Sequence, residues 1–172
     1  MLTAEKKEIS SPPQTYSDWL ECFEILRTKN VTRDTIELLK NGKCIDSDQS
    51  IEFLETQLLI TINAMIKRYI DAFRRDLNCY MMYNEYDGFN RLFYVLAKKL
   101  EGCMFFVNLD FMSTQFRREL YDQIKLNTEK FWKDTYDSLY AQCVEYNNIF
   151  LEDELFLIKR IKLFRECECI EI

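Results

Sequence analysis

The chain has 172 residues, of which 48% are apolar and 15% aromatic, and its formal net charge is −6. This apolar content excludes a disordered chain and is sufficient for one compact domain. Only three glycines and two prolines are present, too few for the frequent turns of a β-sandwich or β-barrel, so we expect helices.

The first fourteen residues differ in character from the rest of the chain. Residues 1–14 are polar and charged, and they include both prolines. We expect them to form a disordered arm that precedes a single helical domain over residues 15–172. The arm lacks the apolar stretch that is typical of a secretion signal, so we expect an intracellular, cytoplasmic protein.

Apolar residues spaced by three and four positions, together with capping residues, predict a series of helices. The expected ranges are 15–30, 32–41, 50–80, 89–101, 113–146 and 148–165. Asn41 and Gly42 are expected to end the second helix with a left-handed backbone. In the third helix, apolar residues between Gln57 and Ile66 spread around most of the circumference, which is typical of a central helix.

Residues 102–111, GCMFFVNLDF, cannot be assigned from their period alone. A short β-pairing of residues 103–107 with residues 167–172 is therefore left open. The expected fold class is all-α, an irregular bundle of five or six helices, two of them about thirty residues long. The longest apolar stretch, Leu58 to Ile66, is far below the ~20 residues of a membrane span, so we expect no membrane partner.

The chain contains no histidine, which excludes several kinds of catalytic and metal site. Ser-His-Asp and Cys-His nucleophile systems, Cys₂His₂ zinc sites and Glu-x-x-His di-iron bundles all need an imidazole. The glycine-dependent Walker A loop and dinucleotide fingerprint are also missing. No spacing singles out a carboxylate, lysine or cysteine site, so we predict that the protein is not an enzyme and has no metal or cofactor.

Seven cysteines are present, and two of them, Cys167 and Cys169, lie one residue apart. On a helix these side chains would point about 200° apart, whereas on a strand they would share a face. A thiolate zinc site usually shows two CxxC pairs, and the sequence has no second close pair. We therefore interpret Cys167 and Cys169 as two small apolar residues in a terminal segment. The other cysteines, Cys22, Cys103 and Cys143 among them, are expected to be ordinary core residues.

Two basic doublets lie one heptad apart in the expected third helix. They are Lys67-Arg68 and Arg74-Arg75. With outward-facing doublets from other helices they would form a basic strip for nucleic acid. The alternative is ordinary solvated faces with acidic partners such as Asp71. The negative net charge disfavours a nucleic-acid partner.

Residues 30–43, NVTRDTIELLKNGK, resemble the second half of a helix-turn-helix unit. By this resemblance alone, Thr32, Arg33 and Thr35 would occupy the base-reading positions. The resemblance covers only this segment. It departs at Leu26, because the first helix of such units usually has a small residue there. A plain helical hairpin is the alternative interpretation.

Trp132, Tyr136 and Tyr140 follow one another at i+4 spacing in the expected long helix. They are either buried between several helices or exposed as a surface for another protein or for self-association. We predict a non-catalytic protein-binding or adaptor module that acts through this aromatic-rich surface. The alternatives are a nucleic-acid-associated regulator that uses residues 30–43 or a basic face, and a helical bundle that binds a small molecule in an aromatic-lined pocket.

Overall fold

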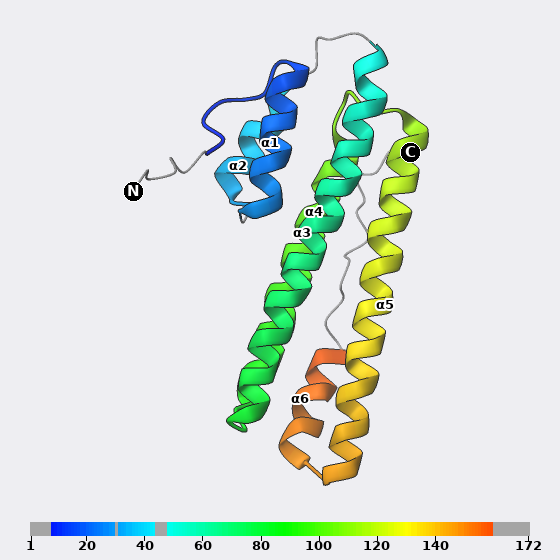
Figure 1. The fold of residues 1–172 in the computed structure, drawn as a ribbon. Coiled ribbons are helices and arrows are strands. Elements are labelled where there is room, and N and C mark those ends of the chain that lie inside the picture. Colours follow the sequence, from blue (N-terminus) through cyan, green and yellow to red (C-terminus); the bar gives the residue numbers. More distant parts are fainter. Residues whose placement is uncertain (1–7, 30, 44–47, 160–172) are drawn as a thin grey trace.

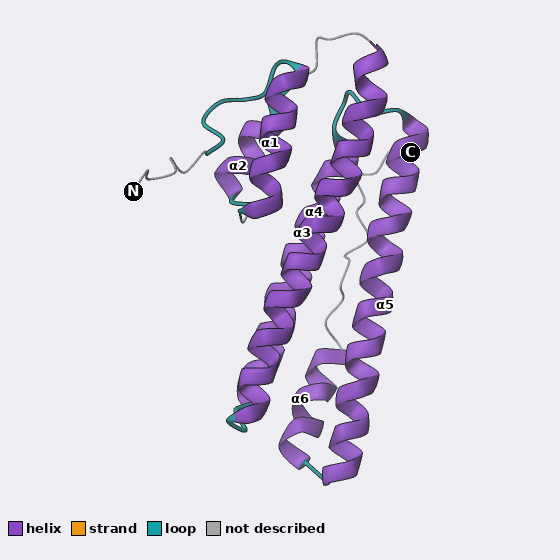
Figure 2. Ribbon diagram, in the orientation of Figure 1, coloured by secondary structure: helices purple, strands orange, loops and turns teal. Residues whose placement is uncertain are grey.

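The computed structural model describes residues 8–29, 31–43 and 48–159. All regular structure in these ranges is helical, and Figure 2 shows no strand among them. The all-α prediction is therefore confirmed. Two of the six α-helices in this part of the chain are long, with 35 and 33 residues, as the apolar periodicity predicted.

The described elements agree closely with the predicted helices. In chain order they are α1 (Tyr16–Thr28), α2 (Arg33–Lys40), α3 (Asp48–Met82), the 3-10 helix η1 (Tyr86–Gly88), α4 (Phe89–Cys103), the 3-10 helix η2 (Met104–Asn108), α5 (Thr114–Tyr146) and α6 (Ile149–Lys159). The predicted end of the last helix, near residue 165, lies outside the described residues.

Side-chain caps determine where three helices begin. The Thr15 hydroxyl accepts a hydrogen bond from the Asp18 N–H, and the Asp18 carboxylate accepts one from the Thr15 N–H, which together form a capping box at α1. Thr32 and Ser113 cap α2 and α5 through the N–H groups three residues further on. At its other end α5 stops at Asn147, whose backbone is left-handed with φ of 46°.

Four helices form the long body of the molecule (Figure 1). α3 runs along its length, α4 returns antiparallel beside it, α5 runs in the direction of α3, and α6 turns back along α5. α6 packs on α4 and α5, and α1 covers the outer side of the N-terminal half of α3. α3 therefore contacts α1, α4 and α5, as predicted for a central helix.

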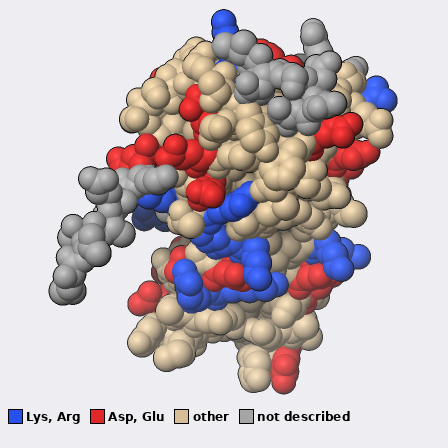
Figure 3. All heavy atoms as spheres, turned by 45° about the horizontal axis from the view of Figure 1, so that its top comes forward, with Lys and Arg blue, Asp and Glu red and all other residues tan. Residues whose placement is uncertain are grey.

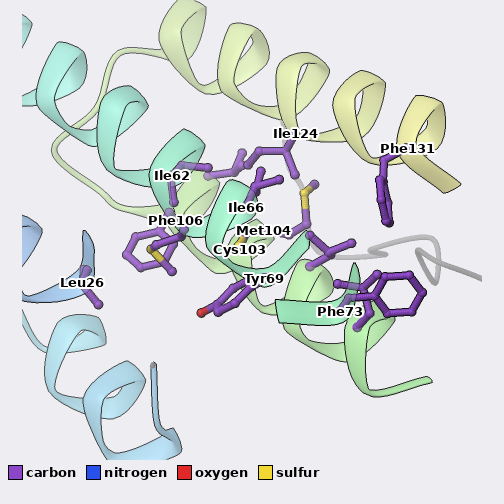
Figure 4. Close-up of a cluster of buried hydrophobic side chains, with 14 of the residues drawn as sticks. Leu26, Ile62, Ile66, Tyr69, Phe73, Cys103, Met104, Phe106, Ile124 and Phe131 are labelled. Carbon is purple, nitrogen blue, oxygen red and sulfur yellow. The ribbon is translucent and has the colours of Figure 1, made fainter. Parts of the chain in front are cut away.

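The core is one cluster of buried side chains that joins α1 to the body (Figure 4). Leu26 of α1, Ile62 of α3, Phe106 of η2 and Ile124 of α5 converge in it, and each is at most 2% exposed. Burial of a side chain of this size contributes about 1.5–3 kcal/mol. The α1 segment is therefore held to α3 mainly by apolar contacts.

Two arginines add polar links between α1 and α3. The Arg27 guanidinium donates to the Thr61 hydroxyl at 2.9 Å and to the Gln57 side-chain carbonyl at 2.7 Å. The Arg68 guanidinium donates to the backbone carbonyl of Lys29 at the end of α1. Both contacts pair a charged donor with an acceptor on the neighbouring helix, so they orient α1 on α3.

Residues 103–107 do not form a strand, so the β-pairing considered for them is wrong. Cys103 completes α4, and η2 follows directly. Met104, Phe106 and Val107 are all buried. Only Phe105 in this run is half-buried, so burial does not alternate with a period of two, and a tight helical turn accommodates the run as well as a strand does. The proposed partner segment, 167–172, lies outside the described residues.

Residues 8–14 pack on the helices. Ile9 lies against the core, Pro13 is buried, and the Pro13 carbonyl accepts a hydrogen bond of 2.8 Å from the Lys43 N–H. The packed chain therefore begins before residue 15, earlier than the predicted boundary. Residues 1–7 of the predicted arm lie outside the described residues.

The predicted left-handed end of α2 is also wrong. Asn41 has φ of −90°, and no glycine in the described residues has a positive φ. Gly42 instead allows a close approach between segments. A Cβ atom there would lie 2.7 Å from the Trp19 ring and 2.8 Å from Cγ of Pro13.

Gly42→Ala is therefore expected to lower the free energy of unfolding by about 1–3 kcal/mol, because the added methyl group overpacks this contact. Gly102→Ala is the control. A Cβ atom at Gly102 meets nothing within 4 Å, and the residue lies in α4. This second change should raise the free energy of unfolding by about 0.5–1 kcal/mol. Urea unfolding measures both, and the same sign for the two variants would contradict the packing described at Gly42.

Candidate functional site

The predicted partner-binding residues, here called the aromatic row, lie in the C-terminal half of α5. Trp132 is half-buried, and its ring meets Phe93 of α4 edge-on with centroids 5.0 Å apart. Tyr136 is half-buried and stacks on Tyr140 at 6.3 Å. Tyr140 itself is 52% exposed. The aromatic row therefore runs from the core to the surface, and Tyr140 is its exposed member.

Tyr140 and several other exposed apolar side chains lie at the end of the bundle where α3 and α5 stop. We call this group the apolar end. It consists of Tyr140, Val144, Tyr146, Ile149 and Phe150 of α5 and α6, and of Met82 and Tyr83 at the end of α3. Each of these side chains is between 52% and 75% exposed. Only Tyr140 was among the residues predicted from sequence. The other six residues could have been found in the sequence from their position, because they are apolar side chains near the residues that end α3 and α5.

Two turns lie beside these exposed side chains. α3 and α5 end at the same end of the bundle, beside Asn84 and Asn147, which have left-handed backbones with φ of 55° and 46°. The core reaches this turn, because Leu151, just beyond Asn147, is buried. The side chains of the apolar end thus lie on the outward faces of their helices. The end is held together by Glu154 of α6, whose carboxylate accepts a hydrogen bond of 3.1 Å from the Asn90 N–H at the start of α4.

Of the predicted basic residues, two line a groove between α3 and α5. Lys67 and Arg74 border this hollow of about 370 Å³, and Arg74 lies over the Phe131 ring at 5.5 Å. Asp71 and Asp134 line the same groove. In Figure 3, blue residues form a band across the molecule with red residues among them. The groove is therefore mixed in charge.

The other two basic residues of the α3 doublets point elsewhere. Consecutive helical residues are about 100° apart, so a doublet cannot present both side chains to one face. Arg68 lies in the contact with α1, where its Nε and Nη1 atoms are buried without a hydrogen-bond partner. Arg75 is exposed. The basic side chains of α3 that share a face are therefore Lys67 and Arg74, and neither Arg68 nor Arg75 lines their groove.

The helix-turn-helix-like residues form the exposed start of α2. The Thr32 and Thr35 hydroxyl oxygens are 2.9 Å apart. Arg33 lies 3.3 Å from the Glu37 carboxylate in an exposed i,i+4 pair. Leu26, where such units have a small residue, is buried in the core. The candidate reading residues thus interact with one another and with Glu37, and base reading by them stays a prediction.

The buried cysteines behave as predicted for core residues. Cys22, Cys103 and Cys143 are buried and Cys79 is exposed. Burial raises the pKa of Cys22 to about 11 and that of Cys103 to about 12. Among the described residues, no three Cys, Asp or Glu side chains gather in a way that could hold a metal ion. The pair at residues 167–169 lies outside this part of the chain.

We expect a thiol-specific alkylating reagent at pH 8 to modify Cys79 at least about a hundredfold faster than Cys22 or Cys103. The reagent attacks thiolates, and a raised pKa together with burial keeps the two core thiols protonated and inaccessible. Peptide mapping by mass spectrometry over time measures the rate at each position. Rates at Cys103 similar to that at Cys79 would contradict the packing around η2.

Comparison with known proteins does not assign the chain: no family model, no curated protein and no solved structure matches it. Within the described ranges, no helix is both long enough and apolar enough to cross a membrane.

Proposed function

We propose that the protein is a non-catalytic binding module that contacts another protein, or a second copy of itself, through the apolar end. The concentration of exposed apolar side chains carries this proposal. Seven of the fourteen large apolar side chains that are exposed among the described residues belong to the apolar end. Contiguous exposed apolar patches on soluble proteins mark interaction sites.

The construction of the aromatic row also suits a binding surface. Tyr140 stacks on Tyr136, and Trp132, one turn earlier, is anchored on the fully buried Phe93. The exposed ring is thus supported by half-buried ones, so little side-chain freedom is lost when a partner covers it. Tyrosine and tryptophan are enriched among the residues that dominate binding energy.

A cytoplasmic location is part of the proposal. The thiols of Cys22, Cys103 and Cys143 are buried and unpaired. Unpaired core cysteines are typical of proteins in a reducing compartment.

The test compares two charge substitutions on one helix. Val144→Asp places a carboxylate in the apolar end, and Leu126→Asp places one in the N-terminal part of α5, at a residue of nearly equal exposure (67% against 65%). Tagged protein captures partners from extracts of the source cell, and quantitative mass spectrometry compares the variants. We expect at least one protein to be retained by the wild type and by L126D, and to fall about tenfold or more with V144D.

The same capture profile for V144D and wild type would contradict the proposal. Arg33→Glu tests the competing hypothesis of a nucleic-acid-associated regulator. That hypothesis would be supported if the set of captured partners changed only in this variant and the variant no longer captured nucleic acid.

A further inference from the structure

The end of the bundle that carries the apolar end is strongly acidic. Segments 76–90 and 134–158 contain nine of the 29 Asp and Glu residues and none of the 23 Lys and Arg residues. The nearest basic residues along the chain are Arg75, Arg91, Lys133 and Lys159. The two segments meet where α6 packs on η1 and α4, and the lowest part of Figure 3 shows only red and tan residues. The field of this end therefore attracts cations.

A hollow of about 730 Å³, here called the end hollow, opens between the η1 turn and the start of α6. Three aromatic side chains line it, Tyr80, Tyr86 and Phe150, together with two carboxylates, Glu85 and Asp87. None of the described residues that line it is basic. Its volume lies within the range of about 300–1,000 Å³ that is common for ligand sites.

Two of these aromatic walls are held in place by the core. The rings of Tyr80 and Tyr86 both pack edge-on against Phe89, at 6.2 Å and 5.5 Å, and Phe89 is fully buried. The Tyr86 hydroxyl donates a hydrogen bond of 3.1 Å to the side-chain carbonyl of Asn84. A Cβ atom at Gly88 would lie 2.2 Å from the Tyr80 ring, so glycine lets the η1 turn lie directly on that ring. The end hollow is thus largely preformed.

These features match the requirements of an organic cation. An aromatic face attracts a guanidinium or ammonium group, and a nearby carboxylate adds a charge-assisted hydrogen bond. We infer that this end of the bundle binds a basic segment of a partner polypeptide, with one Arg or Lys side chain seated in the end hollow beside Glu85 and Asp87. Met82 and Tyr83 contact the apolar residues of that segment. The inference rests on the proposed function and specifies the chemistry of the partner.

The test uses the full chain and a short amphipathic Arg/Leu peptide, with fluorescence anisotropy as the readout. The wild type should bind this peptide and not the matched Glu/Leu peptide. E85Q/D87N should weaken binding about tenfold or more. D122N/E129Q, which removes two exposed carboxylates from α5, away from the end hollow, should change it less than about twofold. Phe150→Leu, which keeps an apolar group but removes the ring, should weaken binding about two- to fivefold.

Three results would overturn the inference: no binding of the Arg/Leu peptide, equal binding of the Glu/Leu peptide, or equal weakening in E85Q/D87N and D122N/E129Q. Its failure can be distinguished from failure of the proposed function. If the peptide does not bind while capture of a protein still depends on Val144, the apolar end binds a partner that is not basic. If capture is also independent of Val144, both proposals fail.

Discussion

Replacing Phe93 with alanine is expected to lower the free energy of unfolding by about 3–5 kcal/mol. Phe93 of α4 is fully buried and meets Phe73 of α3 edge-on at 4.8 Å and Trp132 of α5 at 5.0 Å. The truncation leaves a cavity between three helices, and the loss of these ring contacts adds to the loss of apolar burial. The change also removes the support of the aromatic row.

The adjacent Tyr94→Ala is the matched control. Tyr94 is on the same helix and 52% exposed, so its loss should cost less than about 1 kcal/mol. Urea unfolding followed by circular dichroism measures both variants. A cost for Phe93→Ala no greater than that for Tyr94→Ala would show that the Phe93 ring does not pack against Phe73 and Trp132 as described.

Trp19→Ala is expected to have an effect of similar size, about 3–5 kcal/mol, at the opposite part of the molecule. Trp19 of α1 is fully buried, and its ring lies 5.9 Å from that of Phe23 and 4.8 Å from that of Phe111. Its indole N–H donates to the Lys43 carbonyl at 2.9 Å. The residue therefore connects α1, the end of α2 and the segment before α5.

Trp19→Phe separates the two contributions of this side chain. Phenylalanine keeps most of the apolar volume but leaves the Lys43 carbonyl without the indole donor, which should cost about 1–3 kcal/mol. The two variants are compared by urea unfolding. If the phenylalanine variant lost as much stability as the alanine variant, ring packing would not be the main contribution at this position.

Helix starts could be predicted because their determinants are local. The hydroxyl groups of Thr15, Thr32 and Ser113 each accept a hydrogen bond from an N–H three residues away, so a short stretch of sequence contains the whole interaction. The long periodic stretches of α3 and α5 were predictable for a related reason, since a helical period repeated over many turns fits no other element.

Features that depend on distant residues could not be predicted. Gly42 is required by the Trp19 ring and by Pro13, and neither contact is visible in the sequence around residue 42. The segment 103–107 is helical, and four of its five side chains are buried against neighbouring elements. In both cases tertiary packing determined the outcome that local propensity left open.

The candidate site likewise combines features that the local sequence predicts with features that depend on packing. The i+4 spacing of Tyr136 and Tyr140 identified an aromatic row, but their exposure depends on how far α6 covers α5. The absence of Lys and Arg from 134–158 is visible in the sequence. The sequence does not show that this acidic segment lies beside 76–90. That arrangement, and the end hollow between the two segments, depend on how α4 and α6 fold back along the bundle.

Photocrosslinking inside the cell tests the central claim most directly. A benzoylphenylalanine residue replaces Tyr140 in the apolar end or, as the control, Arg33, whose side chain is 91% exposed at the start of α2. We predict discrete protein adducts from position 140 and none from position 33. Adducts from position 33 alone, or the same adducts from both positions, would contradict binding through the apolar end.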